Sequence, residues 1–139
     1  MNYLVDTNIL CEPRQRRPDE KVVSWLRENE SKLYTSVLVL AEIRYGIDLL
    51  PLGSGKRAEL QRWHTDLVNI MAGRVLSINF SVAEEWARLQ VEMHFNHVVL
   101  PVIDSLLAAT ARRYQLTMAT DNVNHFQSTG VKVLNPFLM

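Results

Sequence analysis

Four acidic residues of this 139-residue chain lie where solubility explains a carboxylate poorly: Asp6, Glu42, Asp104 and Asp121. Two end predicted strands, and two have apolar residues on both sides. Carboxylates gathered away from water repel one another, and each costs several kcal/mol (roughly) unless something positive lies between them. A hard divalent cation with oxygen ligands, Mg²⁺ or Mn²⁺, meets that need. The four acids therefore predict a metal site.

The two strand-ending acids should meet at one edge of a sheet. Asp6 follows the apolar run Tyr3–Val5, and Asp121 follows the run Leu116–Thr120. In open parallel sheets, ligands gather beyond the carboxyl ends of the strands. We therefore expect both side chains at a ligand-binding edge.

The other two acids lie in apolar helical sequence. Glu42 is within Val37–Ile43, and we expect it to be partly buried; Asp104 precedes Leu106–Ala109. A cation held there would lower the pKa of a bound water and neutralise charge on a scissile phosphate. Phosphodiester hydrolysis is the chemistry that this set indicates.

Each acid alone has a simpler explanation except one. Asp6 could serve the Asp-Thr-Asn turn chemistry of its own sequence, Asp104 could be a helix N-cap, and Asp121 with Asn122 could form a hairpin-like turn. Glu42 is different, because a cap does not lie in the middle of a helix. The combination of the four favours the metal site.

Short apolar runs alternate with longer helical patterns, which is typical of an α/β fold with a largely parallel sheet. A capping box at Ser81–Glu84 predicts one helix start. Strands are expected at Tyr3–Val5, Leu33–Thr35, Val75–Ile78, Leu116–Thr120 and Val131–Leu134. Helices are expected from Pro18-Asp19, from Ser36 through Glu42 toward Leu50, from about Gly55 to Met71, from Ser81 through Met93, and over Leu106–Tyr114.

Composition predicts one soluble domain, residues 1–139. The chain is 47% hydrophobic and 22% charged, and its 15 basic and 15 acidic residues cancel. Zero net charge is weak support for nucleic-acid binding, although a basic rim could offset an acidic pocket. The lone Cys11 excludes an internal disulfide, and no apolar run is long enough to span a membrane. These features favour a cytoplasmic protein.

Four motifs follow one another in register and together span the chain. They are Leu4-Val5-Asp6-Thr7-Asn8-Ile9-Leu10; Ser36 with Leu40-Ala41-Glu42-Ile43-Arg44-Tyr45-Gly46; Asp104-Ser105-Leu106-Leu107-Ala108-Ala109-Thr110-Ala111; and Leu116–Thr120 with Phe126, Gly130-Val131 and Leu134-Asn135-Pro136-Phe137. In this order they resemble the PIN-domain family, and within it the VapC/FitB toxin ribonucleases of bacterial toxin–antitoxin pairs.

The resemblance implies a three-layer α/β/α sandwich and a metal-dependent endoribonuclease that acts as a toxin. Its acidic core would be Asp6, Glu42 and Asp104, with Asn8, Ser36 and Thr120 as supporting polar groups. Implied partners are an RNA substrate, a cognate antitoxin and a second copy of the chain, with a larger toxin–antitoxin assembly possible and no membrane.

The fourth acid departs from the family pattern. In FitB-like relatives an acid often falls one residue later, where this chain has Asn122. Either the Asp121 carboxylate or the Asn122 amide oxygen would then complete the site.

Other functions remain open at this point. A phosphatase of the haloacid-dehalogenase type would need an acid where Asn8 stands, and a flavodoxin-like nucleotide binder would need a Gly-rich phosphate loop. A non-catalytic PIN-like binding module with a degenerate metal site is the main alternative. Among the histidines, His94 and His97 lack a third zinc ligand, and only His125 is a candidate substrate contact.

Overall fold

The computed structural model describes all 139 residues around a five-stranded sheet in the order β3-β2-β1-β4-β5. Every neighbouring pair of strands is parallel, which confirms the predicted sheet. The strands lie within the predicted ranges or extend one residue beyond them: β1 (Tyr3–Val5), β2 (Leu33–Ser36), β3 (Val75–Leu76), β4 (Thr117–Ala119) and β5 (Val133–Leu134).

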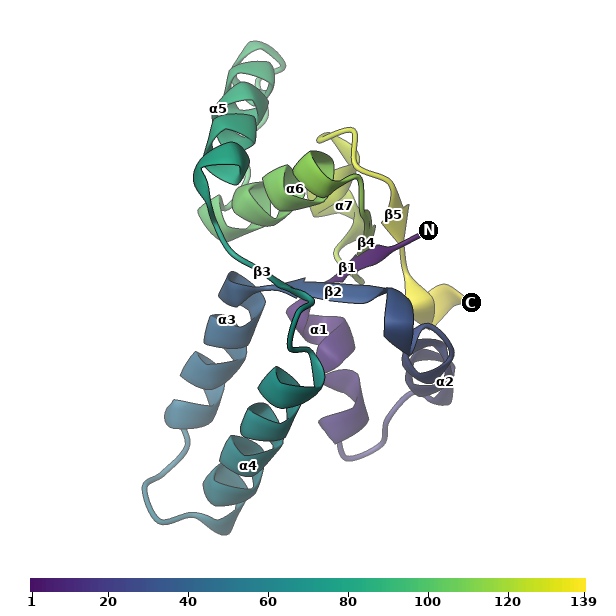
Figure 1. The fold of residues 1–139 in the computed structure, drawn as a ribbon, viewed down its shortest axis with the longest axis vertical. Helices are drawn as coiled ribbons and strands as arrows, with labels where there is room; N and C mark the ends of the chain where they lie inside the picture. Colours follow the sequence, from purple (N-terminus) through teal and green to yellow (C-terminus); the bar gives the residue numbers. More distant parts are fainter.

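Helices cover both faces of this sheet, so the predicted three-layer sandwich is confirmed (Figure 1). The helices α1, α3 and α4 lie on one side, and α5, α6 and α7 lie on the other, with α2 packed against the C-terminal turn Pro136–Leu138. Their bounds are α1 (Thr7–Leu10), α2 (Glu20–Glu28), α3 (Val37–Asp48), α4 (Gly55–Ile70), α5 (Phe80–Phe95), α6 (Val102–Tyr114) and α7 (Val123–Gln127).

The strand order reverses at β1, which has β2 on one side and β4 on the other. At such a switch point the chain leaves neighbouring strands toward opposite faces, and a crevice opens beyond their carboxyl ends. Asp6 and Thr120 are the residues that directly follow β1 and β4. The fold therefore brings the first predicted acid to the place where ligands collect.

The core fixes these strand ends in place. Leu4 and Val5 of β1, Met118 of β4 and Phe126 of α7 are fully buried, and Ile9 of α1 joins them. Fully burying one such side chain contributes about 1.5–3 kcal/mol. The residues that flank the site are thus among the most firmly packed in the molecule.

One local prediction and one of the simpler explanations were wrong, and two short helices were missed, one after β1 and one after β4. The capping box at Ser81 does not start α5, because Asn79 is its N-cap and accepts a hydrogen bond from the Val82 N–H. Asp104 does not cap α6, which begins after Pro101. The short helices α1 and α7 had not been predicted. None of the helices has the length and apolar character that crossing a bilayer requires.

Candidate metal centre

Asp6 is the most enclosed acid, with only 5% of its surface exposed. It is the N-cap of α1: its Oδ1 accepts a hydrogen bond from the Thr7 N–H at 2.8 Å. Its Oδ2 accepts from Thr120 Oγ1 at 2.8 Å and from Asn8 Nδ2 at 3.3 Å. The predicted turn role is therefore real. It accounts for one carboxylate oxygen, while the other is held by Asn8 of α1 and by Thr120, which follows β4.

Glu42 lies on α3 and interacts electrostatically with the other acids. It is more exposed than we predicted. Even so, loss of water around its carboxyl group raises its pKa, and the charges of Asp6 and Asp104 raise it further. The Thr7 hydroxyl lowers the pKa, although the two groups are outside hydrogen-bonding geometry. The carboxylate of Glu42 is therefore near enough to Asp6 and Asp104 for their charges to act on it.

Asp104 lies in the first turn of α6, on the opposite side of the sheet from α3. Its side chain is 17% exposed, and its Oδ2 is 2.7 Å from Nδ1 of His125 on α7. Its charge raises the pKa of both Asp6 and Glu42. Acids that precede α1, lie on α3 and lie in the first turn of α6 therefore interact electrostatically across the switch point.

The electrostatic state of this cluster is unfavourable in the protein alone. Burial raises the pKa of Asp6, and the Asp104 charge adds to the rise, while hydrogen bonds from Thr120, Thr7 and Asn8 lower it. No lysine or arginine forms an ion pair with the three acids; His125 is their one basic neighbour. Repulsion between carboxylates favours the protonated forms until a cation is supplied.

The supporting polar residues occupy two different environments. Asn8 and Thr120 bond Asp6 directly, and the Asn8 Oδ1 also accepts the Asp121 N–H at 3.1 Å. Ser36 is buried and caps α3 by accepting the Leu38 N–H at 3.1 Å. Ser36 thus orients the helix that carries Glu42.

The fourth acid lies apart from the other three. Asp121 and Asn122 are both exposed, and each contributes a backbone N–H to the site, to Asn8 Oδ1 and Thr120 Oγ1 respectively. Neither side chain makes a hydrogen bond. Asn122 begins α7 without a side-chain cap, so no hairpin-like turn forms here.

The residues present fit a hard divalent cation. The donors are carboxylate oxygens, and the buried Thr7 hydroxyl beside them has no hydrogen-bond partner. No three acid, histidine or cysteine side chains lie close enough to enclose a cation by themselves. Mg²⁺ commonly keeps several waters and uses only one or two carboxylates. An open arrangement of this kind suits it.

Sequence reasoning missed two features of the site. The Thr7 hydroxyl gave no signal beyond its place after Asp6. The contact between His125 and Asp104 could have been found only through the short helix α7, which places His125 against α6.

The fold and the site define a class of protein. The family model described as PIN domain matches residues 3–132, and the chain belongs to that family.

Similar proteins come from several bacteria. The chain is 33% identical to Toxin FitB of Neisseria gonorrhoeae over 135 residues, covering 96% of this chain and 97% of that one. It is 27% identical to VapC ribonuclease Y4jK of Sinorhizobium fredii, covering 96% of both. The crystal structure of FitAcB from Neisseria gonorrhoeae matches with a TM-score of 0.91 at 32% identity, over 99% of each chain. A structure of FitAB bound to an IR36 DNA fragment matches with a TM-score of 0.90 at 32% identity, over 97% of this chain and 95% of that one.

Proposed function

We propose that this protein is an endoribonuclease that hydrolyses RNA phosphodiester bonds and acts as the toxin of a toxin–antitoxin pair. A Mg²⁺ or Mn²⁺ ion would be held by Asp6, Glu42 and Asp104, with Asp121 at the rim. One observation carries the proposal: Asp6, Glu42 and Asp104 lie around the switch point, their repulsion raises the pKa of Asp6 and of Glu42, and no lysine or arginine pairs with them. The names of the similar proteins, a toxin and a VapC ribonuclease, support the same activity.

The chain's own residues would prepare the site rather than perform chemistry unaided. Thr120, Asn8 and the Thr7 N–H hold Asp6 in one orientation. When bound, the cation would supply an activated water and neutralise charge on the phosphate. Mutual repulsion of the acids favours binding of a divalent ion over protonation at neutral pH.

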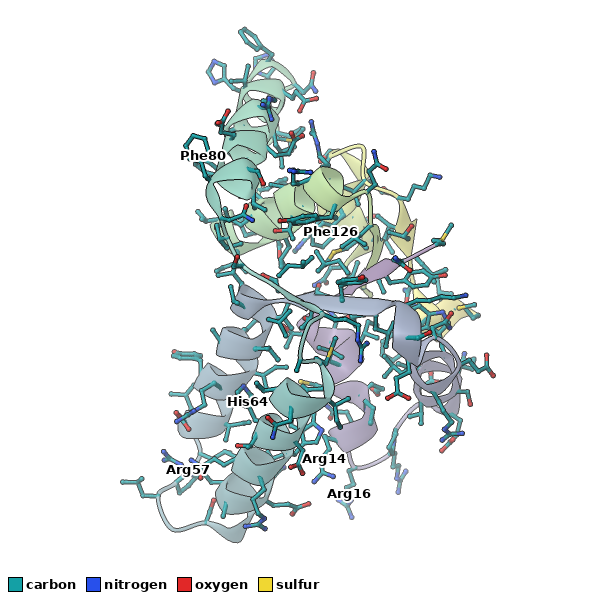
Figure 2. The ribbon with its side chains drawn as sticks, viewed as in Figure 1. Arg14, Arg16, Arg57, His64, Phe80 and Phe126 are labelled. Atoms are coloured by element: carbon teal, nitrogen blue, oxygen red, sulfur yellow. The ribbon has the colours of Figure 1, made fainter.

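The surface carries no net excess of positive charge, because the 15 basic and 15 acidic residues cancel. Arg14 pairs with Glu59, Arg57 with Asp48, and Arg112 with two glutamates. Arg14, Arg16 and Arg57 lie on the side of the sheet that carries α3 and α4 (Figure 2). RNA affinity without metal should therefore be modest, because phosphate contacts from basic residues dominate such affinity.

RNA cleavage with and without divalent metal tests the proposal. Purified protein should cut structured RNA with Mg²⁺ or Mn²⁺ and lose this activity in EDTA, and Asp104→Asn protein prepared in parallel controls for contaminating ribonuclease. Equal cleavage in chelator contradicts the metal assignment. Failure to bind Mn²⁺ or to cut RNA under any condition favours the non-catalytic binding module.

We infer that the second copy of the chain docks on α5. Its residues Phe80, Ala87, Val91 and Phe95 recur at helical spacing on the side opposite the buried Leu89 and are all exposed, Phe80 and Phe95 by 79% and 74%. Trp86 of the same helix is not part of this surface. It packs inward and donates its Nε1–H to Ser105 Oγ.

Sedimentation of the purified protein tests that surface. Phe95→Glu should convert a dimer to a monomer while leaving the fold of each chain unchanged by circular dichroism, because the side chain is exposed within one chain. A dimer that survives Phe80→Glu/Phe95→Glu excludes α5 as the interface. A cognate antitoxin, expected from the FitAB structures, should co-purify with the wild type when both are expressed together.

A further inference from the structure

The imidazole of His125 contacts the carboxylate of Asp104. The Nδ1 atom lies 2.7 Å from Asp104 Oδ2. A carboxylate oxygen accepts hydrogen bonds, so the ring nitrogen that faces it carries the proton. The other oxygen, Asp104 Oδ1, makes no hydrogen bond within the protein, which leaves it free toward the acid cluster.

The position of His125 is fixed by the packing of α7. The neighbouring Phe126 is fully buried, and its carbonyl accepts hydrogen bonds from the Thr129 N–H and hydroxyl. The His125 N–H donates to the Asn122 carbonyl at 3.1 Å. The imidazole is therefore presented to α6 by an anchored turn, although 47% of its side chain is exposed.

A continuous path of hydrogen bonds joins this turn to Asp6. Thr120 Oγ1 donates to Asp6 Oδ2 and accepts the Asn122 N–H at 3.0 Å. Asn122 in turn receives the His125 N–H, and His125 reaches Asp104. The segment from Thr120 to His125 thus sets the spacing between the two most enclosed acids of the site.

We propose that His125 is a positioning residue of the metal centre: by holding Oδ2 of Asp104, it directs Oδ1 toward the cation. This role rests on the proposed function. Partners that orient a ligand in this way are commonly worth about 10- to 100-fold in metal affinity or activity. His125 then takes the structural place for which the sequence had suggested Asp121 or Asn122, whose side chains bond nothing.

Mn²⁺ affinity measured by calorimetry on the full chain tests this role without relying on activity. The variants are His125→Ala, His125→Asn and His125→Gln, with His94→Ala at an exposed histidine far along α5 as the control. An asparagine amide can occupy the place of Nδ1, whereas a glutamine amide reaches only the place of Nε2. Alanine and glutamine should weaken Mn²⁺ binding by about 10- to 100-fold, and asparagine should restore most of it.

Cleavage kinetics give the matching readout. The His125→Ala enzyme should recover its rate when Mn²⁺ is raised, with little change in KM for RNA. Rescue by glutamine and not asparagine, with a raised KM for RNA, overturns the positioning role, because His125 would then act through Nε2 on RNA.

The outcomes also separate this role from the proposed function. Unchanged Mn²⁺ affinity in His125→Ala, beside a wild type that binds Mn²⁺ and cuts RNA, overturns the positioning role alone. A wild type that binds no Mn²⁺ overturns the metal site and this role with it. Thermal unfolding of each variant checks that the exposed substitution has left the fold intact.

Discussion

Two groups of acids in this molecule differ in how their charge is neutralised. On α5 and α6, Arg112 Nε lies 2.9 Å from Glu85 Oε1 and its Nη1 lies 2.6 Å from Glu92 Oε2. Arg88 adds a 2.8 Å contact to Glu85. At the switch point, by contrast, Asp6, Glu42 and Asp104 have no arginine or lysine partner.

The difference distinguishes acids with a structural role from those for which we propose a functional one. The glutamates of α5 are satisfied by cations that the chain itself carries, and they tie two helices together. The acids of the switch point keep an excess of negative charge that raises the pKa of Asp6 and Glu42. Strongly perturbed acids of this kind cluster at functional sites, which is consistent with the cation binding proposed above.

The largest expected effect comes from neutralising one acid of the switch point. Asp104→Asn should reduce RNA cleavage at least about 100-fold, beyond what losing an outer partner costs. Its stability without metal should equal or exceed that of the wild type, because repulsion is relieved and the amide oxygen can still accept the His125 hydrogen bond. Cleavage rates and urea unfolding in EDTA measure both. A clear loss of stability would instead assign Asp104 a structural role.

At the ion pairs between α5 and α6 we expect the opposite result, a loss of stability without a loss of activity. Arg112→Met keeps the apolar stem and removes the cation from two glutamates, so the free energy of unfolding should fall by about 2 kcal/mol, as expected for hydrogen bonds to charged groups. Cleavage per folded molecule should stay at the wild-type rate. If activity falls while stability is unchanged, the comparison between the two acid groups fails.

A smaller effect concerns pH. Because the folded-state pKa of Glu42 is raised, the folded protein binds its proton more tightly than the unfolded chain. The resulting contribution to stability is present at low pH and is lost as pH rises through the raised pKa.

In the Glu42→Gln variant position 42 no longer titrates, so the stability that the wild type loses as pH rises is not lost. Without metal, its stability relative to the wild type should increase as pH rises through this window, by at most about 1 kcal/mol because water screens the exposed group. Urea unfolding of both proteins in EDTA across a pH series measures the difference in their free energies of unfolding. Other carboxyls, such as Asp48, whose pKa is lowered by Arg44, contribute equally to both proteins and cancel in this difference. A difference that is constant with pH contradicts the shift, and saturating Mn²⁺ should abolish it.

Much of the fold was predictable because strong local patterns agreed with it. The buried strands Tyr3–Val5 and Thr117–Ala119 stand out as apolar runs, and α3 and α4 show caps at Ser36 and Ser54. The short helix α7 was missed because its five residues carry too little periodicity. It forms because Phe126 enters the core, which is a tertiary effect.

The site, like the fold, was predictable from sequence only in part. Asp6 could be proposed from sequence because it ends a strand, and Glu42 and Asp104 because they stand among apolar residues, although Glu42 is exposed in the structure. The hydrogen-bond partners of those acids could not be predicted from sequence. Which hydroxyl or imidazole meets a carboxylate depends on the register of β4 against β1 and on α7, and neither is visible in local sequence.

The smallest effect is expected where the prediction from sequence was least decided, at Asp121 and Asn122. Both side chains are exposed, and both residues bond the site only through backbone N–H groups that alanine retains. Asp121→Ala should weaken Mn²⁺ binding by no more than about fivefold, the value of an exposed charge interaction near 1 kcal/mol. Asn122→Ala should change it less, since an amide oxygen carries no net charge. Parallel Mn²⁺ titrations with cleavage rates rank the two. If the Asn122 variant is the more impaired, Asp121 is no part of the site; if Asp121→Ala costs as much as Asp104→Asn, its carboxylate turns inward when the cation binds and completes a four-acid site.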